Sequence, residues 1–210
     1  MIATEAEARA FAAERCDEAV MRQLDDLVDL LKQETARQNL IAKPTEDAVW
    51  TRHLADSAQL LDHVPRETAG PWLDLGTGAG FPGLVIAIMR PEWSVRLVES
   101  RNRRIEWLQG IVSHLQLANC VVDGARLELV ESFHASVISA RAFAPMPRLL
   151  DLSARFSTSD TIWLLPKGRS AAQDAANLPK ALRAMFHVEQ SQTDRDAGIV
   201  VGKGKVELKR

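Results

Sequence analysis

The sequence predicts an α/β fold in which helices cover both faces of a mostly parallel, Rossmann-like sheet. Two observations support this prediction. Beyond residue 70, short apolar segments of strand length alternate with segments of helical periodicity, which is the pattern of a parallel sheet built from βαβ units. Between Asp74 and Gly83, four glycines lie where the first of these strands should pass into a helix.

The chain is predicted to have two parts, a helical extension over residues 1–68 and an α/β domain over residues 69–210. The segment 65–71 contains two prolines and a glycine and is predicted to be the turn-rich boundary between them. We expect the extension to pack on the α/β domain.

Two helices are expected in the extension. Apolar residues recur at helical spacing over residues 20–31, which predicts an amphipathic helix. A second helix should start at Thr45, a residue type that caps helices, and should run to about residue 61 with Trp50 in the core.

The elements of the α/β domain follow from the apolar periodicity. We expect strands at 72–75, 95–99, 120–122, 135–138 and 161–165, and helices over 84–89 and 101–117. A loop is expected at Pro145-Met146-Pro147. Because ligands of such sheets bind at the carboxyl ends of the strands, we expect the functional site there.

The glycine-rich segment predicts a ligand that touches the backbone. Glycine adopts positive φ values and has no Cβ, so a nucleoside or phosphate can approach a turn of this kind closely. The next predicted strand ends at Glu99, at the spacing where βαβ nucleotide folds place the carboxylate that binds a ribose. The segment from Asp74 to Glu99 therefore predicts a mononucleotide-binding unit.

Two ligands fit these glycines. Gly76-x-Gly78-x-Gly80 is the pattern of S-adenosylmethionine (SAM) enzymes, whereas Gly78-x-Gly80-x-x-Gly83 fits the dinucleotide fingerprint. Asp74, two residues before the first glycine, favours SAM. The chain also lacks a second glycine-rich unit for the other half of a dinucleotide.

Composition excludes some classes of function. A net charge of −2 over 210 residues gives no bulk attraction to nucleic acid, so any RNA affinity must come from local basic patches. Cys16 and Cys120 provide neither a disulfide framework nor a metal-ligand spacing. The N-terminus has no signal-peptide pattern, and we expect a cytoplasmic protein without a metal.

Several motifs are more specific than a general glycine loop. The two strongest are Gly80-Phe81-Pro82-Gly83 and Arg52-His53-x-x-Asp56-Ser57. Others are Asn39-Leu40, Val98-Glu99-Ser100, Arg126-Leu127-Glu128, Ser139-Ala140-Arg141-Ala142 and Lys167-Gly168. With these motifs, most of the chain resembles the RsmG (GidB) family of bacterial ribosomal RNA methyltransferases.

The resemblance implies a class I SAM-dependent enzyme with a seven-stranded, mostly parallel sheet. It further implies that N7 of one guanine in the 530 loop of 16S rRNA is methylated to 7-methylguanosine, within the small ribosomal subunit or an assembly intermediate. Carried over by position, the SAM contacts are Gly76, Phe81, Leu127, Glu128 and Arg141. To these the residue chemistry adds Gly78, for close backbone approach, and Glu99, for the ribose.

No catalytic acid or base is predicted. Guanine N7 already has a lone pair and loses no proton when it accepts a methyl group, so the enzyme has only to align sulfur, methyl and N7. Positioning of this kind can supply about 7–11 kcal/mol of the barrier. His53, Asp56 and Ser57 lie side by side on one predicted helix and do not converge as a hydrolytic triad would.

The residues predicted to contact the RNA substrate are Arg52, His53, Arg104 and Lys167. Further candidates for phosphate contact are Arg101, Arg103, Arg148, Arg169, Lys203, Lys205, Lys209 and Arg210. Each of these side chains is equally well explained as a solvated surface charge. Phe143, close to Arg141, could stack on a base.

Two other functions stay open on the sequence alone. One is a SAM-dependent methyltransferase that acts on a small molecule or a protein, which the weak net charge permits. The other is an NAD-dependent oxidoreductase or a non-catalytic nucleotide-binding module, which the alternative glycine pattern permits.

Overall fold

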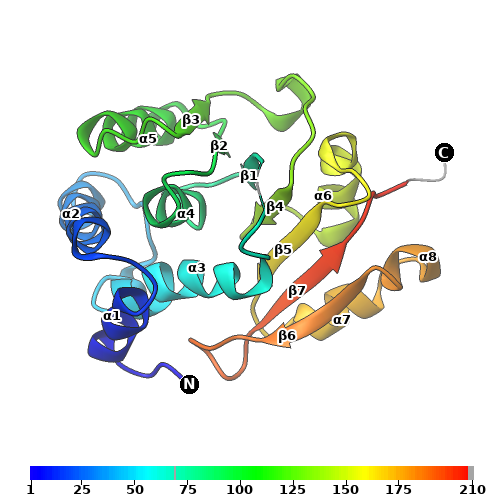
Figure 1. Cartoon of the computed structure of the whole chain (residues 1–210), viewed down its shortest axis with the longest axis horizontal. Coiled ribbons are helices and arrows are strands. Elements are labelled where there is room, and N and C mark those ends of the chain that lie inside the picture. The colour runs from blue at the N-terminus through cyan, green and yellow to red at the C-terminus, as the bar shows by residue number, and fades with distance from the viewer. Residues whose placement is uncertain (69, 208–210) are drawn as a thin grey trace.

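The computed structural model describes residues 1–68 and 70–207 and contains one seven-stranded sheet with helices on both faces (Figure 1). The strands are β1 (Trp72–Leu75), β2 (Val95–Val98), β3 (Cys120–Asp123), β4 (Val137–Ala140), β5 (Ile162–Lys167), β6 (Phe186–Gln190) and β7 (Gly198–Lys203). The α-helices are α1 (Glu5–Ala13), α2 (Glu18–Thr35), α3 (Asp56–Ala58), α4 (Gly83–Met89), α5 (Asn102–His114), α6 (Met146–Ser153), α7 (Ala171–Ala176) and α8 (Lys180–Arg183). A π-helix, η2 (Trp50–Ala55), leads into α3, and the 3-10 helices are η1 (Lys43–Thr45), η3 (Gln59–His63), η4 (Leu127–Leu129) and η5 (Ala154–Phe156).

The strand order is β3-β2-β1-β4-β5-β7-β6. The first five strands are parallel to their neighbours, and β7 is antiparallel to both β5 and β6. The predicted seven-stranded, mostly parallel sheet is therefore confirmed. The order reverses between β1 and β4, which is the point where open α/β sheets form their ligand crevice.

Alternate residues of each central strand enter different cores, as the period of two in a β-strand requires. Trp72 of β1 and Ile162 of β5 belong to a core shared with α1, α2, α4 and α5. Leu73 and Trp163, one position later on the same strands, belong to a second core shared with α6 and α7. Both faces of the sheet are thus buried, which explains why the strand segments of the sequence are almost entirely apolar.

Helices α2 and α3 lie against α4, and α1 packs on η2 and α2, all on the same side of the sheet (Figure 1). The predicted helix over residues 20–31 is confirmed as part of α2, and Trp50 is buried as expected. The division of the chain at residue 68 stays a prediction, and the predicted domain start, residue 69, lies outside the described residues.

Thr45 does not cap the second helix, so that prediction was wrong. Thr45 ends the short helix η1, and its hydroxyl donates to the carbonyl of Ala42 over 2.7 Å. The carboxylate of Glu5 satisfies the start of η2 instead, because it accepts hydrogen bonds from the backbone N–H groups of Trp50 and Thr51 over 2.9 and 2.8 Å. The side chain of Glu5, from α1, therefore caps η2 in place of a residue next to it in the sequence.

Two further predictions need correction. The fourth strand was expected at 135–138 but runs over 137–140, in register with β1. The loop expected at Pro145-Met146-Pro147 is instead the start of α6, because proline is well tolerated in the first turn of a helix. None of the helices in the described ranges is long and apolar enough to span a membrane.

Candidate functional site

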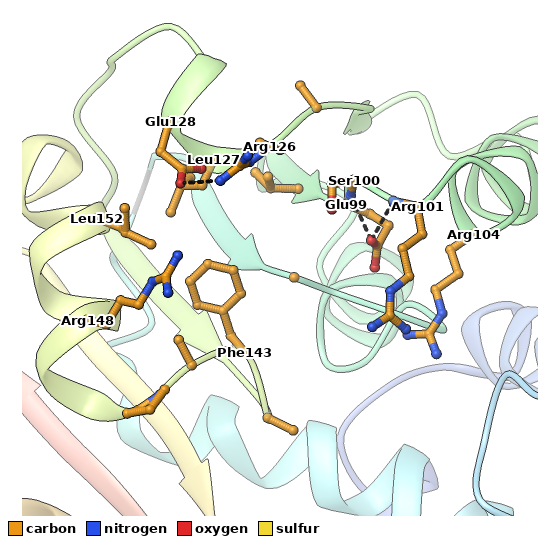
Figure 2. A pocket seen from close by; sticks show the side chains of 16 residues that line it. Glu99, Ser100, Arg101, Arg104, Arg126, Leu127, Glu128, Phe143, Arg148 and Leu152 are labelled. Carbon is orange, nitrogen blue, oxygen red and sulfur yellow. Dashed lines mark hydrogen bonds and ion pairs between the residues drawn. The ribbon is translucent and has the colours of Figure 1, made fainter.

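A cavity of about 510 Å3 lies at the carboxyl ends of the first four strands (Figure 2). Gly76 follows β1 and Glu99 follows β2, while Leu127 and Phe143 come from the segments after β3 and β4. Four parallel strands thus deliver one wall segment each. This volume lies within the 300–1,000 Å3 that is common for small-molecule sites.

The glycine segment has the backbone conformation that its sequence predicts. Gly76, Gly78 and Gly80 have φ values of +60°, +64° and +107°, in the region that other L-residues rarely adopt. A Cβ at Gly76 would also lie 2.5 Å from a ring carbon of Phe143. The turn from β1 to α4 therefore needs glycine for its backbone geometry and for the close approach of Phe143.

Glu99 holds the glycine segment against the turn after β2. Its carboxylate accepts hydrogen bonds from the backbone N–H groups of Gly78, Ser100 and Arg101 over 3.1, 2.7 and 2.9 Å, two of which Figure 2 shows as dashed lines. A carboxylate has about four acceptor sites, so capacity for one further donor is left. The side chain is only 6% exposed and lines the cavity.

The opposite wall is formed by Phe143 and Arg148, with Leu127 and Glu128 between the two sides (Figure 2). Four arginines and two glutamates line the cavity, namely Arg101, Arg104, Arg126, Arg148, Glu99 and Glu128. Because the arginines exceed the glutamates, the mouth of this cavity attracts anionic groups.

Asp74 ties β1 to α4 and to β4 beneath the glycine segment. Its carboxylate accepts hydrogen bonds from the backbone N–H of Gly83 over 3.0 Å and from the hydroxyl of Ser139 over 2.7 Å. The indole N–H of Trp72 donates to the same hydroxyl over 2.8 Å. Burial raises the pKa of Asp74 to about 6, because the charged form loses its hydration.

This raised pKa predicts a pH dependence of stability. Asp74 titrates near 3.8 in the unfolded chain and near 6 in the folded protein, so its contribution is fully present below the lower value and is lost as pH rises through the higher one. We expect the unfolding free energy of the wild type, minus that of Asp74→Asn, to fall by about 2 kcal/mol from about pH 4 to about pH 7. Urea denaturation of both proteins at a series of pH values measures this difference, and a constant difference would contradict the assignment.

A second cavity, about 190 Å3, lies beside the first, between η2 and the ends of β5 and β7. Arg141, which follows β4, lines it together with Arg52, His53 and Lys167. Ala142 and Phe143, the next two residues of the chain, line the first cavity. The segment 141–143 therefore separates the two spaces.

His53 is neutral in this arrangement. Burial, together with the charges of Arg141 and Arg52, lowers the pKa of His53 to about 3. The Arg141 guanidinium must be the donor in its 3.1 Å contact with Nδ1, because it carries no acceptor. The Nε2 nitrogen then donates to the Thr45 hydroxyl over 3.0 Å, and both ring nitrogens are engaged.

The predicted cofactor residues are divided between these surroundings. Gly76, Glu99, Leu127 and Glu128 line the first cavity, and Gly78 is joined to it through its hydrogen bond to Glu99. Arg141 lines the second cavity. Phe81 is buried, with 2% exposure, and its ring centroid lies 5.0 Å from that of His53 and 5.5 Å from the guanidinium carbon of Arg141.

The predicted substrate residues divide in the same way. Arg104 lines the first cavity, and Arg52, His53 and Lys167 line the second. Asp56, on the helix that carries His53, forms a 3.4 Å ion pair with Arg141. No convergent triad of His53, Asp56 and Ser57 forms, since the Ser57 hydroxyl donates to the backbone carbonyl of His53.

Sequence reasoning missed some of the lining residues. Asp194, Gly198 and Ile199 line the second cavity, but they lie in or beside β7, a strand that the periodicity analysis did not identify. The apolar run 199–201 was an available signal for that strand. Asp194 has no local signal, because only the pairing of β7 with β5 brings it to the site.

Among the other predicted phosphate contacts, Lys203 pairs with Ile162 at the start of β5. It thus lies at the edge of the sheet opposite to both cavities. Lys209 and Arg210 lie outside the described residues.

Solved structures with this fold include methyltransferases. The putative methyltransferase yhhF from Escherichia coli has a TM-score of 0.56 and 11% identity, over 72% of this chain and 87% of that one. A mutant of MtNAS in complex with S-adenosylmethionine has a TM-score of 0.53 and 15% identity, over 95% of this chain and 77% of that one. At such identities the likeness concerns the class I methyltransferase fold alone.

Sequence comparison gives the family. The ribosomal RNA small subunit methyltransferase G of Erythrobacter litoralis is 60% identical over 205 residues, covering 98% of this chain and 99% of that protein. The protein of the same name from Novosphingobium aromaticivorans is 55% identical over 206 residues, covering 96% and 89%. Residues 20–196 match the GidB family, described as rRNA small subunit methyltransferase G. With the glycine segment, Glu99 and every residue that lines the first cavity inside the matched residues, the chain belongs to the rRNA small subunit methyltransferase G family.

Proposed function

We propose that this enzyme transfers the methyl group of SAM to N7 of a guanine in 16S rRNA, in the 530 loop of the small ribosomal subunit or of an assembly intermediate. Membership of the family supports methylation of small-subunit rRNA. The observation that carries the assignment of the donor is the cavity of about 510 Å3 between the glycine segment and Glu99.

The first cavity holds the nucleoside part of SAM. Glu99 accepts a hydrogen bond from a ribose hydroxyl with its remaining acceptor capacity, and the adenine lies beside Leu127. The backbone of Gly76 and Gly78 would hold the methionine part, and the guanidinium of Arg141 would be available to bind its carboxylate. Segment 141–143, which lines both cavities, would then be the part of the chain nearest to the sulfonium methyl group.

The sheet topology supports SAM over a dinucleotide. A Rossmann dinucleotide fold has the strand order 3-2-1-4-5-6, built from two βαβαβ halves. Here β7 is antiparallel and lies between β5 and β6, so the second half does not form a complete parallel βαβαβ unit.

The reaction needs alignment and charge stabilisation, not proton transfer. Guanine N7 attacks the methyl carbon while the carbon–sulfur bond breaks, so positive charge moves from sulfur to the purine. His53 cannot serve as a base here, because its Nδ1 already accepts from Arg141. In-line positioning can supply about 7–11 kcal/mol.

The arginines at the mouth of the first cavity provide the RNA contact. Arg101 and Arg104 project from the start of α5 on the Glu99 side, and Arg148 lies on the other side (Figure 2). Guanidinium groups bind phosphate oxygens well, and they supply locally the positive charge that the chain lacks overall. Because N7 lies in the deep groove of A-form RNA, the target base must be unpaired or displaced when it reacts.

Glu99→Ala should weaken SAM binding at least about tenfold, since it removes one charged hydrogen bond to the ribose and the anchor of Gly78. Isothermal calorimetry with SAM measures the change. Glu106→Ala is the matched control, because Glu106 is an exposed glutamate on α5. An unchanged dissociation constant for Glu99→Ala would remove Glu99 from the site.

The experiment that tests the function is the transfer of tritiated methyl from SAM to small ribosomal subunits that lack the modification. Digestion to nucleosides should yield labelled 7-methylguanosine, and digestion to oligonucleotides should then place the label in the 530 loop. Label in another nucleoside would refute the guanine-N7 assignment. Label in a small molecule or protein, with none in the subunits, would favour a different methyl acceptor.

A further inference from the structure

The second cavity has the size of a single nucleobase. Its volume of about 190 Å3 is several times the roughly 30 Å3 that one water occupies, yet it lies below the range of about 300–1,000 Å3 typical of whole small-molecule ligands. It borders segment 141–143, whose other side lines the first cavity. A flat group held here would lie next to the methyl group of SAM.

Lys167 supplies a positive donor that is poorly paired in this cavity. Its side chain is only 11% exposed, and the nearest carboxylate oxygen of Asp174 lies 3.7 Å from the ammonium nitrogen. That distance is too long for a hydrogen bond. An ammonium group with three donors in such a position is well served by an acceptor on a ligand.

Asp194 supplies an acceptor on the same cavity. Its Oδ2 accepts from Arg52 over 2.8 Å, and its Oδ1 accepts from the backbone N–H of Asp196 over 2.9 Å. The hydrogen bond from Arg52 lowers the pKa of Asp194, which keeps the carboxylate ionised at neutral pH. Since a carboxylate has about four acceptor sites, Asp194 can accept further donors from a ligand.

We propose that this cavity receives the target guanine, with Lys167 donating to O6 and Asp194 accepting from N1–H and the 2-amino group. The proposal rests on the proposed function and adds the residues that recognise the base. A flipped base is commonly read through its Watson–Crick edge, which in guanine carries this sequence of one acceptor and two donors. N7 lies on the other side of O6, so it stays free to face the first cavity.

The same pair rejects adenine. Adenine has an amino group where guanine has O6 and an acceptor where guanine has N1–H, so Lys167 would face a donor and Asp194 would face a lone pair. A pocket built from hydrogen-bonding groups discriminates strongly against a ligand that leaves them unmatched.

The test is a double-mutant cycle between Asp194 and the guanine amino group. Subunits are reconstituted around rRNA that carries either guanosine or inosine, which lacks the 2-amino group, at the methylated position. We expect the wild type to lose roughly ten- to a hundredfold in kcat/KM on inosine. Asp194→Ala should lose a similar factor on guanosine but should show less than about threefold further loss on inosine.

Two variants separate recognition of the base from structural effects. Arg52→Ala breaks the same ion pair from the other side and should keep the wild-type preference for guanosine over inosine. Asp25→Ala removes another Arg–Asp pair, the 2.6 Å contact with Arg9 on the exposed surface of α1 and α2, and should change neither activity nor preference. The dissociation constant for SAM should be the same in Asp194→Ala and in the wild type.

The outcomes distinguish this inference from the function on which it rests. Equal sensitivity of the wild type and Asp194→Ala to inosine, with normal transfer to guanosine, would overturn the base pocket and leave the methyltransferase assignment intact. If Arg52→Ala also became insensitive to inosine, Asp194 would act only through Arg52. Failure of the wild type to methylate guanosine subunits would overturn both.

Discussion

Replacing Gly78 by valine should abolish measurable SAM binding while the protein stays folded. Gly78 has φ +64°, a conformation that a β-branched residue rarely adopts. A Cβ there would lie 2.8 Å from the guanidinium of Arg104, a flexible group that can move away. The strain should lower the unfolding free energy by about 1–3 kcal/mol, but the methyl groups of valine would occupy the approach of the cofactor.

Two measurements test this prediction. Calorimetry should show a loss of at least about a hundredfold in SAM affinity, equivalent to about 3 kcal/mol, and thermal unfolding should still show one cooperative transition. Gly110→Val is the matched control, because no heavy atom lies within 4 Å of the Cβ that it would carry in α5. SAM binding of normal strength by folded Gly78→Val would show that the cofactor does not approach this residue.

Gly83→Ala should destabilise the protein by about 3 kcal/mol, although helix propensity alone predicts a gain of about 1 kcal/mol. Gly83 is the first residue of α4, and a Cβ there would lie 2.1 Å from a methyl carbon of Leu97 and 2.9 Å from Oδ2 of Asp74. Both neighbours are buried in the sheet. The helix would have to move away from β1 and β2, and the hydrogen bond from Gly83 to Asp74 would be lost.

Chemical denaturation of Gly83→Ala and Gly110→Ala side by side measures these opposite effects. Gly83 is the first residue of its helix and Gly110 lies in a helix interior, so propensity favours alanine at both positions, most strongly at Gly110, and only packing can make the Gly83 variant less stable. We expect Gly110→Ala to gain about 0.5–1 kcal/mol. A gain in stability for Gly83→Ala would show that α4 does not lie as close to the sheet as described.

The sequence was informative where the signal is local. The glycine segment, the strands 72–75 and 95–98 and the carboxylate of Glu99 were all predicted, because left-handed backbone and buried parallel strands leave marks within ten residues. Glu99 and Gly78 were each predicted to face the cofactor, and in the structure a hydrogen bond joins them. The proximity of Gly76 and Phe143 has no local signature, since it depends on the pairing of β1 with β4.

Other parts depend on tertiary contacts that no window of sequence contains. The start of η2 is satisfied by Glu5, more than forty residues earlier, so the local preference for Thr45 was misleading. The strands β6 and β7 are held by antiparallel pairing at the edge of the sheet. In β6 only Phe186 is fully buried, so this strand has no continuous apolar run that a sequence search could find. Asp194 enters the second cavity only as a result of that pairing.

The second cavity is closed by residues from opposite ends of the chain, with Arg52 and His53 on one wall and Asp194 and Ile199 on another. During synthesis, every residue of the first cavity, from Gly76 to Leu152, has been added before the last wall of the second exists. A nascent chain or a fragment that ends before β7 therefore carries every residue that lines the first cavity but lacks Gly198 and Ile199 of the second. If the second cavity receives the target base as proposed, the order of synthesis makes acceptance of that base the last property that the polypeptide acquires.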